Sequence, residues 1–251
     1  MIWSRGRLVA LSLLIAGCGE DGEPGAGSSE LVISAASSLE PAFTAYVETA
    51  GIDAKQSFAG SDDLAAQIRQ GVRPDIYAAA NTSLPDALHE EGLVFEPVVF
   101  AGNELVLAVP AGSGIDSLDD LGGEEDLAIG DDGVPVGDYT REVVDRLPAR
   151  LAEAIIDNVG SREPDVAGIV GKLSQGAVDA GFVYVTDVVA TDGGLEAIEL
   201  PRKLQPEVAY GIAIVEGAEN PEGAQAFIDG LLDGGGEQAL LDAGFLPPPG
   251  G

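Results

Sequence analysis

The sequence predicts an α/β chain built in two halves, and three observations lead to this prediction. From Leu31 onward, short apolar runs alternate with segments of helical period. Gly, Ser or Asp residues separate most of these segments. The alternation is interrupted once, at 94–109, where two apolar runs follow each other without a helix between them. Alternation of this kind is typical of a parallel sheet with right-handed crossovers.

The first half contains three pairs of strand and helix. Strands are expected at 31–36, 56–59 and 75–80, and helices at 39–50, 62–70 and 84–91. A glycine follows each helix, at Gly51, Gly71 and Gly92, as is common where a helix ends. The apolar runs 94–100 and 104–110 then lead into the second half.

The second half repeats the alternation less regularly. Strands are expected at 127–130, 180–185, 195–200 and 208–215, and helices at 137–147, 166–175, 220–232 and 237–243. No repeat of fixed period accompanies them, which argues against a solenoid or propeller. Two unequal α/β series with a double apolar run between them indicate two lobes joined by extended crossovers.

The charge of the chain excludes whole classes of partner. Its 251 residues include 12 basic and 43 acidic side chains, for a formal net charge of −31. Nucleic acids and anionic membrane surfaces require a positive footprint, so we expect neither to bind the folded body. Apolar residues make up 45% of the chain, which argues against a disordered protein.

The first 18 residues look like a secretory signal. Arg5 and Arg7 precede the apolar run 8–16, which is too short for a permanent membrane anchor. The ending 14–18 (LIAGC) resembles a bacterial lipoprotein box, so we expect lipidation at Cys18 and a secreted protein held at the membrane. Residues 19–29 read as a flexible tether. The alternative is an ordinary signal peptide that ends in a chance cysteine.

The sequence offers little for catalysis. His89 is the single histidine, and no Gly-x-Ser-x-Gly elbow accompanies it. Zinc ligands in clusters, a phosphate loop and a calcium loop are all missing from the sequence. The acidic clusters 124–126 and 131–132 fit solvated faces better than calcium sites. We therefore expect a binding protein, with no cofactor and no directly bound metal cation, rather than an enzyme.

Four strand-to-helix junctions carry the residues that could bind a ligand. They are Ser37-Ser38, 60–62, 134–137 and Asp165-Val166. The first N–H groups of a helix lack internal partners and carry about half a positive charge, so several helix starts that converge can hold an anion without lysine or arginine. Serine hydroxyls add further donors. The alternative reading of each serine is a simple N-cap.

At these junctions the chain resembles the periplasmic molybdate-binding proteins of ABC importers. The resemblance extends from Leu31 to about Pro247. The stretches that carry it are 32–39 (VISAASSL), 57–61 (SFAGS), 64–68 (LAAQI), 74–79 (PDIYAA), 102–110 (GNELVLAVP), 134–137 (VPVG), 165–166 (DV), 181–184 (GFVY) and 210–216 (YGIAIVE). Each stretch is ordinary alone, whereas their combination in this order is specific.

The resemblance implies a two-lobed periplasmic-binding-protein fold, in which each lobe is a sheet flanked by helices and a two-strand hinge joins the lobes. Lobe I would comprise 30–108 and 206–251, and lobe II would comprise 109–205. Ligand would bridge the lobes and favour the closed state, because only closure brings both sets of donors together. The chain would act as a monomer and deliver its ligand to an ABC permease.

The same resemblance implies the site residues. The oxyanion, molybdate or tungstate, would be held by the hydroxyls of Ser38, Ser61 and Tyr184 and by the amides of Val136 and Val166. Sulfate or phosphate as ligand, and a secreted hydrolase that uses His89, remain as alternatives. One departure from the family pattern is Asp62-Asp63, directly after the second serine. Because a carboxylate beside a dianion is repelled, we expect both side chains to point outward.

Overall fold

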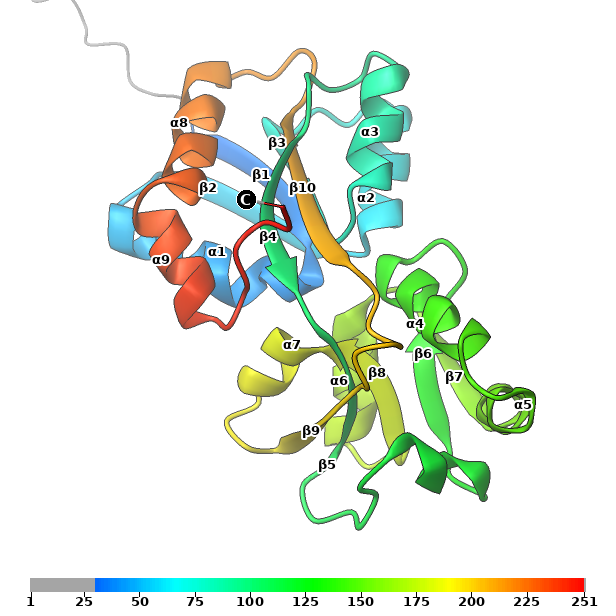
Figure 1. Cartoon of the computed structure of the whole chain (residues 1–251). Coiled ribbons are helices and arrows are strands. Elements are labelled where there is room, and N and C mark those ends of the chain that lie inside the picture. Colours follow the sequence, from blue (N-terminus) through cyan, green and yellow to red (C-terminus); the bar gives the residue numbers. More distant parts are fainter. Residues whose placement is uncertain (1–29, 251) are drawn as a thin grey trace, which may run out of the picture.

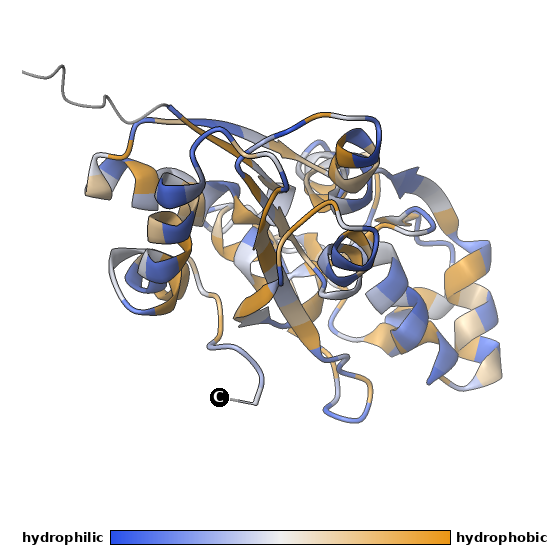
Figure 2. Ribbon diagram, turned by 90° about the horizontal axis from the view of Figure 1, so that it is seen from above, coloured by the Kyte–Doolittle hydropathy of each residue, from blue (hydrophilic) through white to orange (hydrophobic). Residues whose placement is uncertain are grey.

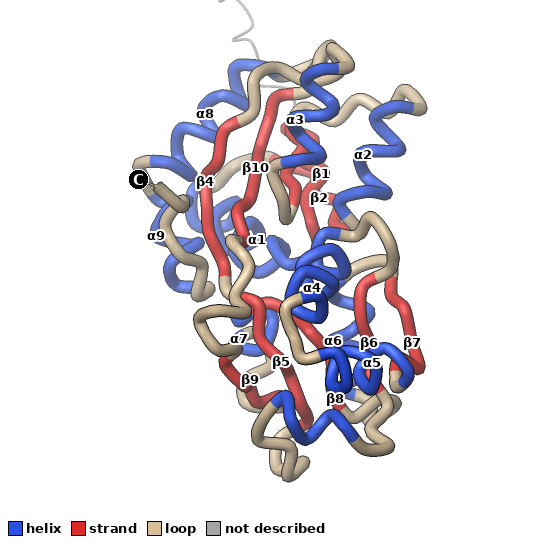
Figure 3. The backbone as a smooth tube through the Cα atoms, turned by 45° about the vertical axis from the view of Figure 1, so that its right-hand side comes forward, coloured by secondary structure: helices blue, strands red, loops and turns tan. Residues whose placement is uncertain are grey.

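Two five-stranded sheets form the centres of two lobes in the computed structural model, which describes residues 30–250 (Figure 1). The two-lobed α/β prediction is thereby confirmed. Figure 3 shows that the lobes lie one above the other and that the chain passes between them at one side. Hydrophobic residues follow the strands in the middle of the molecule, and the helices around them alternate hydrophobic with hydrophilic residues (Figure 2).

The first lobe consists of segments from both ends of the described chain. In spatial order its strands are β2 (Ala54–Ala59), β1 (Leu31–Ala36), β3 (Ile76–Ala79), β10 (Val208–Ile214) and β4 (Val98–Asn103). Its helices are η1 (Ser37–Leu39), α1 (Glu40–Ala50), α2 (Ser61–Arg69), α3 (Ser83–Glu90), α8 (Pro221–Leu232) and α9 (Gly235–Asp242). Helices α2 and α3 cover one face of the sheet, and α1, α8 and α9 cover the other (Figure 1).

The second lobe is formed by the middle of the chain. In spatial order its strands are β7 (Val159–Glu163), β6 (Leu127–Gly130), β8 (Ala180–Tyr184), β5 (Leu105–Pro110) and β9 (Leu195–Glu199). Its helices are η2 (Leu118–Gly122), α4 (Pro135–Asp145), α5 (Ala149–Asp157), α6 (Val166–Ser174) and α7 (Val185–Val189).

Both sheets are mixed, so the parallel arrangement indicated by the alternation holds for only part of each sheet. Strands β1, β2 and β3 pair in parallel, as do β6, β7 and β8, which follow the predicted alternation of strand and helix. Strand β10 pairs antiparallel with β3 and β4, and β5 pairs antiparallel with β8 and β9. The reason is the connection between lobes, because β5 and β10 enter their sheets from the other lobe and run against the local direction.

The chain changes lobe earlier than predicted. The expected boundary after residue 108 falls inside β5, whose residues pair with β8 and β9 of the second sheet. The outward crossover is therefore at Glu104, between β4 and β5, and the return runs through 200–207, between β9 and β10. The apolar pattern marked both runs, but it does not show to which sheet each run belongs.

Four elements were not predicted, namely η2, β7, α5 and α7. Helix α5 buries only Ile155 fully, the edge strand β7 alternates half-buried with exposed residues, and α7 is a single short turn region. The exposed alternation of β7 and the shortness of η2 and α7 explain three of the omissions, whereas α5 has a clear helical period, with apolar residues at 151, 152, 155 and 156, and was missed in spite of it. The predicted signal peptide, tether and lipidation site at Cys18 lie outside the described residues. Within 30–250, no helix has the length and apolar character needed to cross a membrane.

Candidate functional site

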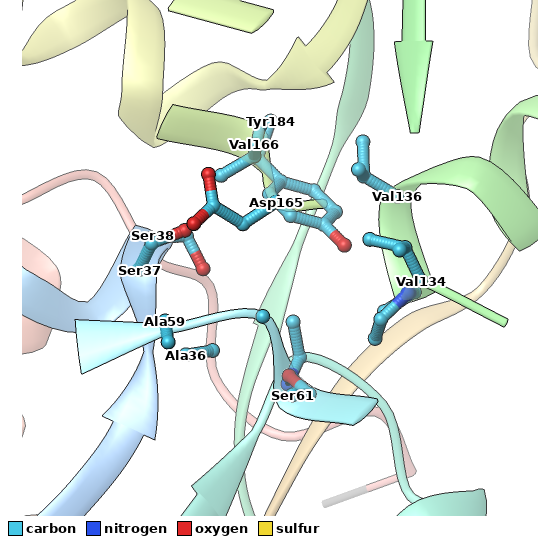
Figure 4. Close-up of a pocket in the computed structure, with 13 residues that line it drawn as sticks. Ala36, Ser37, Ser38, Ala59, Ser61, Val134, Val136, Asp165, Val166 and Tyr184 are labelled. Carbon is cyan, nitrogen blue, oxygen red and sulfur yellow. Dashed lines mark hydrogen bonds between the residues drawn. The ribbon is translucent and has the colours of Figure 1, made fainter. Parts of the chain in front are cut away.

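A pocket of about 210 Å³, solvent at its mouth included, lies where the two lobes meet (Figure 4). Strands of both lobes end here and helices begin, which is where open α/β sheets bind ligands. The residues that line it are Ala36, Ser37, Ser38, Ala59, Gly60, Ser61, Ala80, Val134, Pro135, Val136, Asp165, Val166 and Tyr184. All five residues predicted to hold the oxyanion are among them.

Ser38 and Ser61 are each held from behind by a hydrogen bond. The Ser38 hydroxyl, in η1, lies 2.9 Å from the hydroxyl of Tyr210. The Ser61 hydroxyl, the first residue of α2, accepts the Ala80 N–H at 3.1 Å. The N-cap of α2 is Gly60, so the reading of Ser61 as an N-cap does not hold.

Tyr184 supplies a buried hydroxyl without a partner. It ends β8 and is 1% exposed. Among the described residues its hydroxyl oxygen has no hydrogen-bond partner, which is costly for a buried polar group. Burial raises the pKa of this phenol well above its ordinary value, so it stays protonated and can donate. Figure 4 shows the ring pointing into the pocket.

Val136 and Val166 bring two helix starts to the second-lobe wall of the pocket. Val166 is the first residue of α6 and Val136 the second residue of α4, positions whose N–H groups have no acceptor within the helix. Helix α4 begins directly against β6. This close contact requires glycine at position 137, because a Cβ there would clash with the carbonyl oxygen of Gly130. Glycine at position 137 thus sets where the amide of Val136 lies.

The pocket gathers donors without cations. Among its described lining residues there is no lysine, arginine or histidine. One carboxylate lines it, Asp165, whose Oδ1 caps α6 by accepting the Gly168 N–H at 2.8 Å. The arrangement therefore suits a small anion that accepts many hydrogen bonds.

The two acidic residues after Ser61 differ in orientation. Asp63 is exposed, as expected. Asp62 is only partly exposed, and its buried Oδ1 has no partner among the described residues. Burial is the main cause that raises the pKa of Asp62, and the charges of Asp63 and, more weakly, Asp138 add to it. The expectation of an outward side chain is thus wrong for Asp62, although Asp62 does not line the pocket.

The lobes touch around the pocket, so the structure is closed. A Cβ on Gly60 of the first lobe would lie closer than 3.0 Å to the carbonyl oxygen of Pro164 in the second. Helix α6 of the second lobe contacts η1 of the first. These contacts bring Ser38 and Ser61 to the same pocket as the second-lobe donors.

The other residues considered from the sequence lie elsewhere. His89 is exposed on α3, where its Nδ1 is 3.1 Å from the carbonyl oxygen of Val94. The described chain contains no group of three or more His, Cys, Asp or Glu residues placed to hold a metal ion, and this includes the clusters 124–126 and 131–132.

Several residues behind the pocket were not predicted. Tyr210 and Asn103 are buried behind Ser38, and the half-buried Asp187 accepts the Tyr184 N–H. Tyr210 and Asn103 fall in the stretches 210–216 and 102–110 that carry the family resemblance. That resemblance assigned them no role. The contacts of Tyr210 with Ser38 and Asn103 join segments too distant in the chain for spacing to reveal.

Comparisons with known proteins agree with this arrangement. A profile of the family described as bacterial extracellular solute-binding protein matches residues 31–246. Molybdate-binding protein ModA of Mycobacterium tuberculosis is 30% identical over 234 residues, which cover 90% of this chain and 87% of that protein. Molybdate-binding protein ModA of Haemophilus influenzae is 29% identical over 255 residues, covering 94% and 96%.

A solved structure agrees in fold. The periplasmic molybdate-binding protein of Azotobacter vinelandii superposes with a TM-score of 0.78 at 18% identity, covering 87% of this chain and all of that one. At that identity the match concerns the fold, whereas the family profile and the sequence relatives extend over nearly the whole described chain. The chain therefore belongs to the bacterial extracellular solute-binding proteins and is a relative, within them, of the molybdate-binding proteins.

Proposed function

We propose that this protein captures molybdate, and tungstate with it, between its two lobes outside the cytoplasmic membrane and delivers it to an ABC permease. The observation that carries the proposal is the buried, partnerless hydroxyl of Tyr184, which faces the same pocket as Ser38 and Ser61. An oxyanion would give each of these hydroxyls the acceptor that it needs. Val136 and Val166 would add backbone donors from the second lobe.

The donor set is strong enough for tight binding. Five to seven charge-assisted hydrogen bonds contribute roughly 1.5–3 kcal/mol each. Micromolar to nanomolar affinity requires only about 8–12 kcal/mol. The surplus offsets dehydration of the dianion and ordering of the lobes. Molybdate and tungstate have the same charge and shape, so the same donors would serve both.

Sequence relatives favour molybdate over the alternatives. The two relatives described above are both molybdate-binding proteins. Sulfate has the same tetrahedral shape, so it is included in the test as an alternative ligand. A hydrolase would need His89 near the pocket, and His89 is not among the residues that line it.

Isothermal titration calorimetry with molybdate, tungstate, sulfate and phosphate tests the proposal. Ser38→Ala, Ser61→Ala and Tyr184→Phe should each weaken molybdate binding by about 1–3 kcal/mol. Tyr46→Phe on α1 and Ser113→Ala in an exposed loop remove the same groups away from the pocket, and both should bind like the unchanged protein. If none of the three pocket substitutions weakened molybdate binding, the site would lie elsewhere.

The anchoring of the protein is a separate part of the proposal. We propose that residues 1–18 direct export and that Cys18 is acylated, so that a monomeric body is tethered by 19–29. Labelling of cells with a fatty acid would mark the unchanged protein. Cys18→Ala should lose the label and release the protein from the membrane fraction, and a label that persists would refute acylation at this residue.

A further inference from the structure

We propose that Tyr210 and Asn103 hold the Ser38 hydroxyl as a hydrogen-bond donor toward the pocket, so that the site favours oxyanions that carry no proton. The inference rests on the proposed function and deepens it by naming what selects the ligand. Both residues lie behind the pocket rather than in it. They are therefore positioning residues that act through Ser38.

A buried chain of polar side chains joins the pocket to the crossover between the lobes. The Ser38 hydroxyl lies 2.9 Å from the Tyr210 hydroxyl. The Asn103 amide nitrogen lies 3.4 Å from the same Tyr210 oxygen and 3.0 Å from the hydroxyl of Thr186 in α7. All four side chains are buried, so water does not compete for these groups.

Asn103 fixes which atom donates in each of these hydrogen bonds. The backbone N–H of Glu104 donates to Asn103 Oδ1 at 2.9 Å. A backbone N–H can only donate, so this bond identifies the oxygen of the side-chain amide and leaves Nδ2 facing Tyr210 and Thr186. The amide nitrogen can only donate in turn. The oxygen of Tyr210 must therefore accept from Asn103.

Tyr210 passes this direction on to Ser38. Its oxygen accepts from Asn103, and its own proton remains to be donated. The acceptor within reach is the Ser38 oxygen. Burial keeps the pKa of Tyr210 well above its ordinary value, so the phenol retains that proton. Ser38 then receives a hydrogen bond from behind, and its own O–H is left to point into the pocket.

Ser61 shows the same arrangement from a different source. The Ala80 N–H donates to the Ser61 oxygen at 3.1 Å, so the Ser61 proton is likewise left for the pocket. Both serines thus turn their proton toward the pocket, and one lone pair of each is engaged from behind. Ser61 obtains this from the backbone, which no side-chain substitution removes. Ser38 obtains it from Tyr210 and Asn103, which can be changed.

This polarity discriminates between oxyanions by their protons. Molybdate and sulfate at mildly alkaline pH accept hydrogen bonds at every oxygen, whereas hydrogen phosphate carries one O–H that needs an acceptor. A Ser38 hydroxyl whose proton points at the oxyanion opposes that O–H. Asp165 is a carboxylate at the pocket wall that could accept it, so the test follows the change in selectivity on substitution and not its absolute value.

Two substitutions alter these hydrogen bonds and keep the packing of the side chains. Tyr210→Phe keeps the ring, which packs against Tyr184 at 5.8 Å and Phe245 at 5.2 Å between centroids, and frees the Ser38 hydroxyl to rotate. Asn103→Asp replaces the donor by an acceptor of the same shape. Tyr210 would then donate to the new carboxylate, and Ser38 would donate to Tyr210 and face the pocket as an acceptor.

A matched control separates polarity from added charge. Asn81→Asp introduces the same carboxylate next to Ala80, which lines the pocket. The Asn81 oxygen already accepts the Leu84 N–H at 3.2 Å, so an aspartate preserves that bond. This control should weaken all anions by a similar factor and leave the ratio between them unchanged.

The experiment measures molybdate and sulfate affinity by calorimetry, and phosphate affinity by competition against molybdate, at mildly alkaline pH. We expect the preference for molybdate over phosphate to fall about tenfold in Tyr210→Phe, the factor equivalent to ~1.4 kcal/mol, and further in Asn103→Asp. The preference for sulfate over phosphate, two anions of similar size, should fall in parallel. In a Ser38→Ala background, Tyr210→Phe should no longer change either preference.

The outcomes separate this inference from the proposed function. Loss of affinity by one common factor for all anions, in both variants, would overturn the role of the chain while leaving molybdate capture intact. If the unchanged protein bound sulfate and not molybdate, the proposed function would be overturned. The change in sulfate-to-phosphate preference in the variants would then still test the role of Tyr210 and Asn103. Melting curves without ligand identify a variant that is unfolded, in which case the other variant decides.

Discussion

Gly60 is the position where one added methyl group should prevent closure of the lobes. Its backbone is compatible with alanine, because its φ is −58° and its ψ is 135°. The obstacle is on the other lobe, where the Pro164 carbonyl oxygen would lie closer than 3.0 Å to the new Cβ. Backbone of a rigid strand-to-helix junction cannot move aside as a flexible side chain would. We therefore expect Gly60→Ala to hold the lobes apart.

The size of the effect follows from the hydrogen bonds that bridge the lobes. Relief of the clash requires a separation of roughly 0.5–1 Å. A hydrogen bond of about 2.9 Å would lengthen to about 3.4–3.9 Å, where little of it remains. Three of the proposed donors, on Val136, Val166 and Tyr184, belong to the second lobe. Losing most of one or two such bonds, at ~1.5–3 kcal/mol each, would weaken binding by about 2–4 kcal/mol.

Calorimetry with molybdate measures that loss, and small-angle scattering with and without ligand reports closure. Gly122→Ala is the matched control, because Gly122 is exposed and a Cβ there meets no atom within 4 Å. The melting temperature of ligand-free Gly60→Ala should match the unchanged protein, since open lobes do not clash. Molybdate binding by Gly60→Ala at unchanged affinity would refute the reasoning, because the bound state would then not contain this contact.

Three further predictions follow from charges and close contacts. Burial raises the pKa of Asp187 to about 7 from 3.8, so the native state holds its proton more tightly than the unfolded state. This group's contribution to stability should decline by up to about 4 kcal/mol as pH rises from about 4 to about 7, and chemical unfolding of Asp187→Asn should lack that decline. Asp187 accepts the Tyr184 N–H and faces Asp165 and Tyr210, and asparagine keeps the first contact. Asp62→Asn should strengthen molybdate binding by about 1 kcal/mol, because that is the repulsion expected in water between a unit charge and a dianion about 8 Å apart. An unchanged affinity in calorimetry would show that Asp62 lies farther from the ligand than this. With a net charge of −31, the association rate in stopped flow should rise with added salt, and a fall would contradict repulsion as the long-range force.

The sequence was informative where one local rule decides the structure. Helix starts at 61 and 166 lie at or within one residue of the predicted positions, because serine, aspartate and glycine mark such starts. The same junctions contained Ser38, Ser61, Val136 and Val166, since ligands gather where parallel strands end, whereas Tyr184 was named only by the family resemblance. The edge strand β7 was missed because its stability comes from pairing with β6 and not from a strong apolar pattern of its own, whereas α5 has such a pattern and was missed in spite of it.

Long-range contacts explain the rest. The antiparallel pairing of β10 with β3 and β4 depends on the return of the chain from the second lobe, which no local pattern encodes. The contact between Ser38 and Tyr210 joins residues 172 positions apart. Whether Ser38 donates or accepts is decided through Tyr210 by the Glu104 N–H, at the crossover. The residues of the pocket were therefore predictable one at a time, whereas the direction of their hydrogen bonds was not.

A protein with this much negative charge can hold a dianion because the two effects act over different distances. The surface carboxylates act through water, where a charge pair at about 4 Å contributes only about 1 kcal/mol and salt screens it within about 10 Å. The pocket donors act at hydrogen-bond distance in a site from which the closed lobes exclude water. Their polarity is set by buried groups such as Tyr210 and Ala80 that carry no net charge. Affinity and selectivity should therefore respond to single buried hydroxyls far more than to surface charge, so removing several exposed carboxylates should alter the association rate while leaving the preference among oxyanions unchanged.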